Sequence, residues 1–224
     1  MPNEQENGLL YFPKATLDRL KLYQMVLAEL PDKENISSDE IAERLKITPE
    51  QVRKDISYIK YNGKPKVGYH IKTLLEELNR LFGTTNKNNV ILAGVGHLGA
   101  AIANYPGFSA YGMEIVALFD SDPQKQGTFV RDLTVLPIKD LRRIIKRFKV
   151  EIGIICVPKE SAQSLAEQMV ACGIRAIWNF APIILRVPDD IVVEDENISI
   201  SLLGLKHKLE QRRQERQIVK NTPS

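Results

Sequence analysis

The sequence predicts an α/β protein of two domains, in which a small, mainly helical domain precedes a domain built on a parallel sheet. Two patterns carry this prediction. In the first third of the chain, two short helices with capping sequences are separated by a three-residue turn and followed by a basic, turn-rich segment. Further along, an apolar strand leads into a glycine-rich turn and a helix, and strands and helices then alternate. The first pattern is typical of a winged helix-turn-helix domain, and the second of a Rossmann-like parallel-sheet domain.

The length and composition exclude several classes of protein. The chain has 224 residues, of which 43% are hydrophobic and 26% are charged, values typical of a globular protein with room for two modest domains. Uninterrupted apolar stretches reach only about six residues, whereas a helix needs about 20 to cross a membrane. The polar, acidic N-terminus lacks the basic and apolar regions of a signal peptide. We therefore expect a cytoplasmic protein with no membrane partner.

The cysteines and histidines indicate no metal or redox centre within the chain. Cys156 lies in a strand-like run and Cys172 near a helix end, which favours buried free thiols over a disulfide. The histidines, His70, His97 and His207, are scattered without the spacing of metal ligands. We therefore expect no metal site, and any redox sensitivity has to come from a bound cofactor.

Basic side chains are concentrated in two segments. Between Arg44 and Lys72 there are eight basic residues and two acidic ones. A second basic cluster occupies the C-terminal tail and consists of Lys206, Lys208, Arg212, Arg213, Arg216 and Lys220. Such clusters suggest a polyanion partner, although charge alone is explained more simply by a solvated surface.

The N-terminal domain is predicted to open with an amphipathic helix over 15–30. Ser37 and Glu40 then form a capping box that starts a second helix. After a three-residue turn, Thr48 caps a third helix, in which Gln51 is expected to complete a second capping box. Two short helices joined in this way form a helix-turn-helix pattern.

The third helix, expected over 49–59, has the properties of a DNA-recognition helix. Val52, Ile56 and Ile59 form its apolar face, and its other faces carry polar and basic side chains. A turn-rich hairpin over 61–69 is predicted to form the wing, and an amphipathic helix over 71–82 closes the domain. The alternative is a small helical domain for protein contacts, but the capping boxes together with the basic hairpin favour DNA binding. The candidate DNA-binding residues are Gln51, Arg53, Lys54, Ser57, Tyr58, Lys60, Lys64 and Lys66.

A dinucleotide site is predicted at the glycine-rich turn. The apolar strand over 90–93 leads into Gly94-Val95-Gly96-His97-Leu98-Gly99 and then into a helix over 100–104. Glycines in this pattern allow a tight turn, close approach of the backbone to a pyrophosphate and close helix–strand packing. The helix N-terminus supplies amide donors to the phosphates. The motif alone is a weak indication, but its position between a strand and a helix strengthens it.

Asp120 ends the next predicted strand, 21 residues after Gly99, where a carboxylate is expected to bind the ribose hydroxyls. The alternative is an ordinary turn residue that opens Asp120-Ser121-Asp122-Pro123. The glycine motif favours the ribose role. A carboxylate there repels a 2′-phosphate and no arginine follows closely, so NAD(H) is favoured over NADP(H).

Alternating strands and helices continue the sheet domain. Strands are expected over 133–136, 152–157, 176–180 and 191–193, and helices over 138–148 and 161–172. The strand ends at Val157-Pro158 and Asn179 are expected to face the same crevice as Gly94. The candidate cofactor-binding residues are therefore Gly94, Val95, Gly96, His97, Leu98, Gly99, Asp120, Val157, Pro158 and Asn179.

A last helix is expected from Asn197 to about Gln217. Its first half is apolar and its second half is basic. The apolar side chains are Ile198, Ile200, Leu202, Leu203, Leu205 and Leu209. Such a helix is expected to be buried at the interface of a homodimer.

Motifs along nearly the whole chain resemble those of the redox-sensing repressor family called Rex. They are Pro13-Lys14-Ala15-Thr16 with Arg19-Leu20, Gln51-Val52-Arg53-Lys54-Asp55 with Ser57-Tyr58, Val67-Gly68-Tyr69, the glycine motif, Asn104-Tyr105-Pro106-Gly107-Phe108, Val157-Pro158, Gly173-Ile174 and Asn179-Phe180-Ala181-Pro182. The resemblance implies a winged helix joined to a Rossmann domain, and a homodimer whose C-terminal helices are exchanged between protomers. It also implies a repressor that binds a palindromic operator when cofactor-free or NAD⁺-bound and leaves it when NADH binds.

The resemblance further implies a switch and a division of the chain. In the family, an aspartate near the start of the swapped helix pairs with the arginine at Arg19 and the tyrosine at Tyr105. The resemblance thus adds Tyr105 to the cofactor site, while the aligned position of that aspartate is Asn197 in this sequence. The implied domains are 1–85 for the winged helix, 86–196 for NAD(H) binding and 197–224 for the swapped helix and basic tail.

Three positions depart from the family's pattern, as in a divergent paralogue. Ile59-Lys60 stands where the family usually has Phe-Gly, and Gly63-Lys64-Pro65-Lys66 where its wing has two basic residues followed by glycine. Asn197 lacks the charge of the family's aspartate. DNA binding by the wing and the redox switch are the functions that these departures affect.

An enzyme is the alternative from another class: a small NAD-dependent oxidoreductase or a CoA-binding enzyme domain. Cys156, His97 and Lys159 lie near the predicted crevice, but they form no set of nucleophile, base and orienting group. An enzyme would also have no use for the helix-turn-helix. The sequence therefore favours a regulator without catalytic residues.

Overall fold

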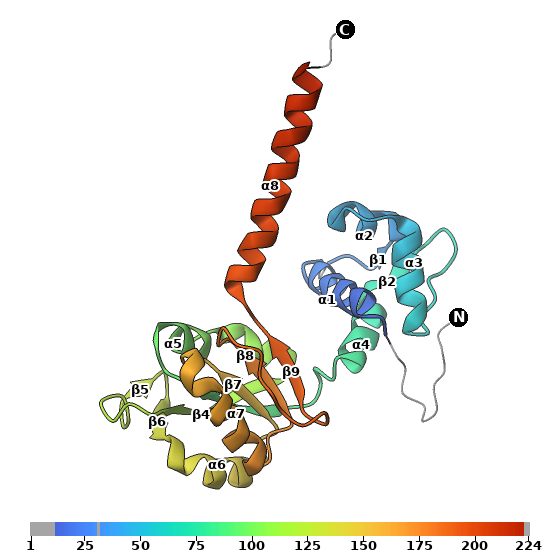
Figure 1. The fold of residues 1–224 in the computed structure, drawn as a ribbon. Helices are drawn as coiled ribbons and strands as arrows, with labels where there is room; N and C mark the ends of the chain where they lie inside the picture. Colours follow the sequence, from blue (N-terminus) through green and yellow to red (C-terminus); the bar gives the residue numbers. More distant parts are fainter. Residues whose placement is uncertain (1–11, 31, 222–224) are drawn as a thin grey trace. The chain divides into compact units, whose positions relative to one another are not determined.

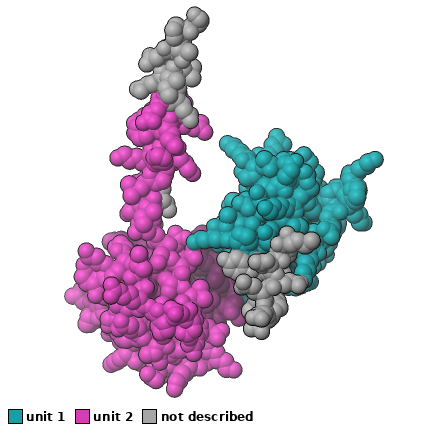
Figure 2. Space-filling model, turned by 45° about the vertical axis from the view of Figure 1, so that its right-hand side comes forward, with its two compact units in different colours: residues 1–86 teal, residues 87–224 magenta. Residues whose placement is uncertain are grey.

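The computed structural model describes residues 12–30 and 32–221, which belong to two compact units of residues 1–86 and 87–224. Figure 2 colours these units separately. Each unit encloses its own apolar core, so each is described by itself.

Unit 1 combines helices with a small antiparallel sheet (Figure 1). Its helices are α1 (Lys14–Ala28), α2 (Ser38–Leu45), α3 (Pro49–Tyr58) and α4 (Ile71–Leu81), and its strands are β1 (Asn35–Ile36) and β2 (Tyr69–His70). Leu20, Ile41, Val52 and Leu74, one from each helix, are fully buried in a shared core. The helix-turn-helix pair α2–α3 is thus fixed on α1 and α4.

The capping box of α2 is confirmed. The Ser37 hydroxyl accepts a hydrogen bond from the Glu40 backbone N–H at 3.1 Å, and the Glu40 carboxylate accepts one from the Ser37 N–H at 2.9 Å. The capping box expected at α3 is only half correct. The Thr48 hydroxyl accepts from the Gln51 N–H at 3.2 Å, but the Gln51 side chain donates to Asp55. The buried Asp55 carboxylate binds the Nε2 end of this amide one turn along α3, so the Gln51 side chain turns away from the Thr48 N–H that a capping box would need it to accept from.

The hairpin predicted over 61–69 is confirmed in a shorter form. Lys64 and Gly68 form an antiparallel bridge around a three-residue turn, with the Lys64 N–H donating to the Gly68 carbonyl at 2.8 Å and the Gly68 N–H to the Lys64 carbonyl at 2.9 Å. Tyr69 and His70 instead pair with β1, where Tyr69 lies opposite Ile36. The reason is burial, since Tyr69 and Ile36 both lie in the core of unit 1. The wing is therefore a short hairpin anchored by β2.

Unit 2 is built on a parallel sheet. Among the described residues, the sheet has seven strands in the order β5-β6-β4-β3-β7-β8-β9, and each neighbouring pair is parallel except β5 and β6. The strands are β3 (Asn88–Ala93), β4 (Met113–Asp120), β5 (Phe129–Val130), β6 (Leu133–Pro137), β7 (Ile152–Ile155), β8 (Ala176–Asn179) and β9 (Val192–Asp195). From β6 to β9 this is the order of a doubly wound dinucleotide-binding sheet, whose strand order reverses between β3 and β7.

Helices cover both faces of the sheet (Figure 1). They are α5 (His97–Ala103), α6 (Leu141–Phe148) and α7 (Lys159–Cys172), with the 3₁₀ turns η1 (Pro106–Tyr111) and η2 (Ile138–Asp140). Alternate residues of β3 serve the two faces. Ile91 and Ala93 pack with α6 and α7, while Val90 and Leu92 pack with α5. The predicted Rossmann-like architecture is confirmed. The helix predicted from Ala100 begins earlier, at His97, and β5 was not predicted.

The last helix, α8 (Ile198–Asn221), begins where the sequence predicts it. The Asn197 Oδ1 caps it by accepting from the N–H groups of Ser199 and Ile200 at 3.1 and 3.2 Å. Five apolar side chains of α8 are 50–65% exposed: Ile200, Leu202, Leu203, Leu205 and Leu209. The side chain of Ile198 lies outside the described residues. Within the described ranges, no helix has the length and apolar character to cross a membrane.

Candidate nucleic-acid interface and dinucleotide site

The outer face of α3 presents the predicted DNA-binding side chains of this helix. Arg53, Lys54 and Ser57 are exposed, whereas Gln51 and Tyr58 are half-buried. The Tyr58 ring lies 5.9 Å from the Phe12 ring, so this side chain also contributes to packing. Val52 and Ile56 point into the core and thereby fix which face of α3 is turned outward.

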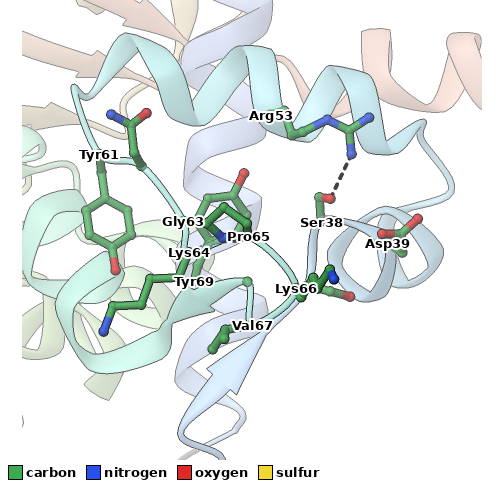
Figure 3. Close-up of a pocket in the computed structure, with 13 residues that line it drawn as sticks. Ser38, Asp39, Arg53, Tyr61, Gly63, Lys64, Pro65, Lys66, Val67 and Tyr69 are labelled. Carbon is green, nitrogen blue, oxygen red and sulfur yellow. Dashed lines mark hydrogen bonds between the residues drawn. The ribbon is translucent and has the colours of Figure 1, made fainter.

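A cavity of about 570 Å³ lies between α2, α3 and the wing loop. Figure 3 shows Arg53 reaching from α3 to Ser38 at the start of α2, with Lys64, Pro65 and Lys66 of the wing on the same cavity. The Arg53 Nη1 donates to the Ser38 hydroxyl at 3.0 Å, and its Nη2 donates to Glu50 at 3.1 Å. The structure thus gathers an arginine, two lysines and a hydroxyl around one hollow, a combination suited to phosphate oxygens.

Two of the predicted DNA-binding lysines hold left-handed backbone conformations. The φ angle is 54° at Lys60 and 64° at Lys66. Residues other than glycine rarely adopt this region, which explains why glycine suits the position of Lys60 in the resembling family. Lys60, Lys64 and Lys66 are all exposed. In the two departures that lie in unit 1, a lysine therefore has a backbone conformation that glycine adopts at lower energetic cost.

Asp55 is a functional candidate that the sequence analysis missed. The carboxylate is fully buried, yet it lies on α3 and accepts hydrogen bonds from Arg19 Nε at 2.6 Å and Arg19 Nη2 at 2.8 Å. Thr16, Tyr23 and Gln51 donate to it at 3.1, 2.7 and 2.9 Å. Helical spacing from Val52 and Ile59, which places position 55 on the inward face, could have revealed it.

These hydrogen bonds determine the charge of Asp55. Desolvation acts to raise the pKa of the carboxyl, but hydrogen bonds from Arg19, Tyr23 and Gln51 outweigh it and hold the pKa below its ordinary value. Burial raises the pKa of Tyr23, which therefore remains a neutral donor. Asp55 is thus a buried anion that ties α1 to the recognition helix.

A second cavity, of about 580 Å³, lies over the glycine turn of unit 2. It brings together seven of the predicted cofactor-binding residues: Gly94, Gly96, His97, Leu98, Asp120, Val157 and Pro158. Gly94 has a φ of +96°, and a Cβ there would overlap the Cys156 carbonyl. A Cβ on Gly99 would overlap the Gly94 carbonyl, whereas the space around Gly96 is open. These glycines serve the close packing and close approach that the motif predicts.

Asp120 faces this cavity and also braces the glycine turn. Its Oδ2 accepts from the Val95 N–H at 2.8 Å and from Lys125 Nζ at 3.1 Å, and its Oδ1 accepts from the Asp122 N–H at 2.9 Å. Desolvation acts to raise the pKa of Asp120, but these donors hold it below its ordinary value. Lys125, which the sequence analysis did not single out, places a cation beside the carboxylate on the cavity wall.

Four predicted cofactor-binding residues do not line this cavity: Val95 and Gly99, which belong to the glycine turn itself, and Asn179 and Tyr105. Asn179 is fully buried, and its amide donates to the carbonyls of Ala181 and Ile183 and to Asp195, so it fixes the loop after β8. Tyr105 is 56% exposed and lines a separate cavity of about 500 Å³. Their part in cofactor binding stays a prediction.

A chain of aromatic rings joins the walls of these two cavities. Tyr105 lies 5.2 Å from Phe108, Phe108 lies 5.9 Å from Trp178, and Trp178 lies 4.6 Å from Phe180, each distance joining ring centroids. Tyr105 lines one cavity and Phe180 the other. No local sequence pattern connects these residues, because their contact depends on the position of β8 in the sheet.

The residues of the predicted switch have other partners within their own units. The Arg19 side chain, 24% exposed, is bound to Asp55 in unit 1. In unit 2, Asn197 caps α8 and Tyr105 packs against Phe108. The role of these residues in a switch stays a prediction.

Known protein families and curated relatives match both units of the chain. Residues 12–57 match the family model described as Putative DNA-binding protein N-terminus, and residues 85–183 match the CoA binding domain model. The Redox-sensing transcriptional repressor Rex 2 of Thermotoga maritima is 42% identical over 201 residues, which cover 90% of this chain and 98% of that protein. Rex of Desulforamulus reducens is 40% identical over 207 residues, covering 89% and 99%.

Solved structures resemble the chain over nearly its whole length. RSP in complex with beta-NAD⁺ and operator DNA is 35% identical, with a TM-score of 0.86 over 96% of this chain and 100% of that chain. RSP in complex with beta-NADH is also 35% identical, with a TM-score of 0.84 over 94% and 100%. A third structure, of RSP as a Rex-family repressor, is likewise 35% identical, with a TM-score of 0.84 over 94% of this chain and 99% of that chain.

Proposed function

Because the chain belongs to the Rex family of redox-sensing transcriptional repressors, we propose that unit 1 binds operator DNA and that NADH, bound to unit 2, releases it. The observation that carries this proposal is the presence in one chain of an exposed, basic recognition helix and a glycine-lined cavity with an ionised aspartate. The relatives are transcriptional repressors rather than enzymes, so the alternative of an oxidoreductase or a CoA-binding enzyme is not retained.

Contacts with DNA are proposed for α3 and the wing. Arg53 and Lys54 project from α3 toward solvent, and Lys64 and Lys66 flank the hollow beside Arg53. In this arrangement α3 enters the major groove, while the wing lysines neutralise phosphates. The proposed set also includes Gln51, Ser57, Tyr58 and Lys60.

NAD(H) is proposed to bind over the glycine turn. The pyrophosphate would lie against Gly94–Gly96, and Asp120 would accept hydrogen bonds from the adenosine ribose. An ionised Asp120 disfavours a 2′-phosphate, which supports NAD(H) over NADP(H) even with Lys125 nearby. The nicotinamide, when bound, supplies the redox difference: its ring is cationic in NAD⁺ and neutral in NADH.

A homodimer with exchanged α8 helices is proposed as the acting form. The exposed leucines of α8 support it, because an apolar helix is stable in water only when its apolar face is covered. A dimer also matches a palindromic operator, since a two-fold axis places two recognition helices on two half-sites. A protein that acts on chromosomal DNA in this way works in the cytoplasm.

The proposal is tested by operator selection followed by titration with both cofactors. The full chain is used to select duplexes from a random pool, and affinity for the selected duplex is measured at fixed salt with NAD⁺ and with NADH. We expect a palindrome whose affinity falls with NADH more than with NAD⁺. Equal affinities in the presence of bound NAD⁺ and bound NADH would overturn the sensing half, because a ligand shifts an equilibrium only by its differential affinity.

A further inference from the structure

The Asp55 carboxylate accepts hydrogen bonds from two helices, α1 and α3. Four of the five found among the described residues come from α1: two from Arg19 and one each from Thr16 and Tyr23. The fifth comes from Gln51 Nε2, one turn earlier on α3, at 2.9 Å. The α1 donors already fix the carboxylate, so the contact with Gln51 acts in the opposite direction and orients the glutamine.

The contact fixes which end of the Gln51 amide faces the protein. A carboxylate accepts only, so Nε2 has to point toward Asp55 and Oε1 has to point elsewhere. One Nε2 hydrogen is used by Asp55. No other side-chain hydrogen bond of Gln51 is found in the described part of the chain, so Oε1 and the second hydrogen are available to a ligand.

We infer that Asp55 is a positioning residue for base recognition: it presents the Gln51 amide so that one acceptor and one donor select adenine. Adenine offers the matching pair in the major groove, the N6 amino donor and the N7 acceptor. Gln51 lies in the first turn of α3, the part of a recognition helix that meets base edges. The inference rests on the proposed function, since it assigns a base to the same helix.

The tie to Asp55 also excludes guanine. Guanine presents two acceptors, O6 and N7, and a free glutamine amide could donate one hydrogen to each. With one hydrogen committed to a buried carboxylate, Gln51 has a single donor left. Without Asp55, rotation of the amide would restore both hydrogens, and discrimination between adenine and guanine would weaken.

The test uses the full chain and a duplex that it selects from a random pool. We expect adenine at one position in each half-site. Replacing that adenine by 7-deazaadenine, which lacks the N7 acceptor, or by purine, which lacks the N6 amino group, should weaken wild-type binding about tenfold or more. In Gln51→Ala the same replacements should have no effect.

Asp55→Asn and a matched control separate positioning from simple support of the fold. In Asp55→Asn, adenine and guanine at this position should be bound about equally, while preferences at the other positions remain. Tyr23→Phe removes a different hydrogen bond to the same carboxylate and should keep the preference for adenine. A uniform loss at all positions in Asp55→Asn, or a retained preference for adenine, would overturn the inference.

A second measurement does not require the variant to fold. In the operator complex of the wild type, NMR of the Gln51 side-chain amide should show one hydrogen protected from exchange and one in contact with DNA. Two hydrogens that both contact the DNA, with neither next to Asp55, would contradict the inference. If Gln51→Ala leaves the base preferences unchanged, the inference fails and the proposed function stands. If the wild type selects no duplex, the proposed function fails and the inference falls with it.

Discussion

The basic side chains of α3 differ in how they are held before DNA is bound. Arg53 is oriented by Ser38 and Glu50, whereas Lys54 extends from the exposed face of the helix. If Arg53 contacts a guanine edge, Arg53→Ala should cost about 1–3 kcal/mol of binding free energy and relax the preference at one base pair. Lys54→Ala, as loss of a phosphate contact, should weaken all duplexes alike and reduce the salt slope by about one.

Both effects are checked by titrating each variant with the selected duplex and with a scrambled duplex at several salt concentrations. Arg80→Ala serves as the matched control, because Arg80 is an exposed arginine of the same unit that pairs with Glu77 on α4. Unchanged binding in both α3 variants would rule out α3 as the recognition helix.

Asp120 offers a test of the dinucleotide site. Asp120→Ala removes an acceptor from the cavity wall and also the brace on the Val95 N–H, so both cofactors should lose affinity by a similar factor of about ten or more. Calorimetric titration with NAD⁺ and NADH measures this loss. Asp132→Ala, an acidic residue on the other cavity of unit 2, should leave both affinities unchanged. A loss confined to one cofactor would mean that Asp120 contacts the nicotinamide end.

The depressed pKa of Asp55 predicts how unit 1 responds to acid. Its folded pKa lies below the ordinary value of 3.8, so its contribution to stability is present above that value and is lost as the pH falls through the folded pKa. The stability advantage of wild type over Asp55→Asn should therefore be constant above about pH 5 and shrink below pH 4. Hydrogen exchange of α3 amides reports this advantage, with Asp32→Asn as the control for losing one exposed carboxylate. An advantage that grows in acid would contradict the assignment.

At the scale of elements, α8 is the segment whose partner is predicted rather than observed. Its exposed leucines stop at Leu209, and the basic part follows. Ending the chain at Asn197 should convert a dimer into monomers with exposed apolar surface elsewhere, as seen by sedimentation and binding of a hydrophobic dye. Ending it at Glu210 keeps every leucine of the apolar half and should leave the dimer intact. A truncation at Asn197 that still sediments as a dimer would exclude the exchanged helix.

Local patterns predicted most elements, and long-range pairing explains the errors. The Ser37–Glu40 box and the glycine turn depend on neighbours within a few residues, so the sequence was sufficient for them. The hairpin over 61–69 is shorter than predicted because Tyr69, in β2, pairs with β1, more than 30 residues earlier in the chain. Helical spacing places Asp55 on the inward face of α3, but its partners could not be predicted, since Arg19 and Tyr23 lie on another helix and no periodicity connects them with it. Asn179 is predicted to bind the cofactor from its place at a strand end, and this stays a prediction; that its amide also holds the following loop depends on contacts that no local pattern reveals.

At the scale of the whole molecule, sensing requires that cofactor binding to unit 2 be thermodynamically coupled to DNA binding by unit 1. The cofactor can change DNA affinity only by the difference in its binding to two conformations, typically 1–3 kcal/mol. Within unit 1, the Asp55 cluster links Arg19 on α1 to Gln51 on the recognition helix. A contact that displaces the Arg19 guanidinium would therefore alter the Asp55 carboxylate and, through it, the position of Gln51, which is proposed to contact a base. In the predicted switch, the residue that pairs with Arg19 therefore determines how much the cofactor changes operator affinity.

Asn197 is the residue that sets this strength in the proposed switch. In the family pattern an aspartate at this position pairs with the arginine and tyrosine corresponding to Arg19 and Tyr105, whereas an amide lacks the charge. Since Asp55 already neutralises much of the Arg19 charge, we expect a shallow response in the wild type. Asn197→Asp should enlarge the ratio of operator affinities measured with NAD⁺ and with NADH, because it adds a carboxylate that favours the DNA-bound arrangement.

The variant is well controlled because Asn197 has a defined local role as the cap of α8. Aspartate and serine are both good caps, so Asn197→Asp and Asn197→Ser should keep the helix equally well, and only the former adds charge. The decisive comparison is the operator affinity of wild type and both variants, each titrated with NAD⁺ and NADH at one salt concentration. A larger ratio in Asn197→Asp alone identifies a charge effect. Equal ratios in all three proteins would show that the start of α8 does not couple cofactor to DNA, since neither the charge nor the cap at this position would then change the balance of the two states.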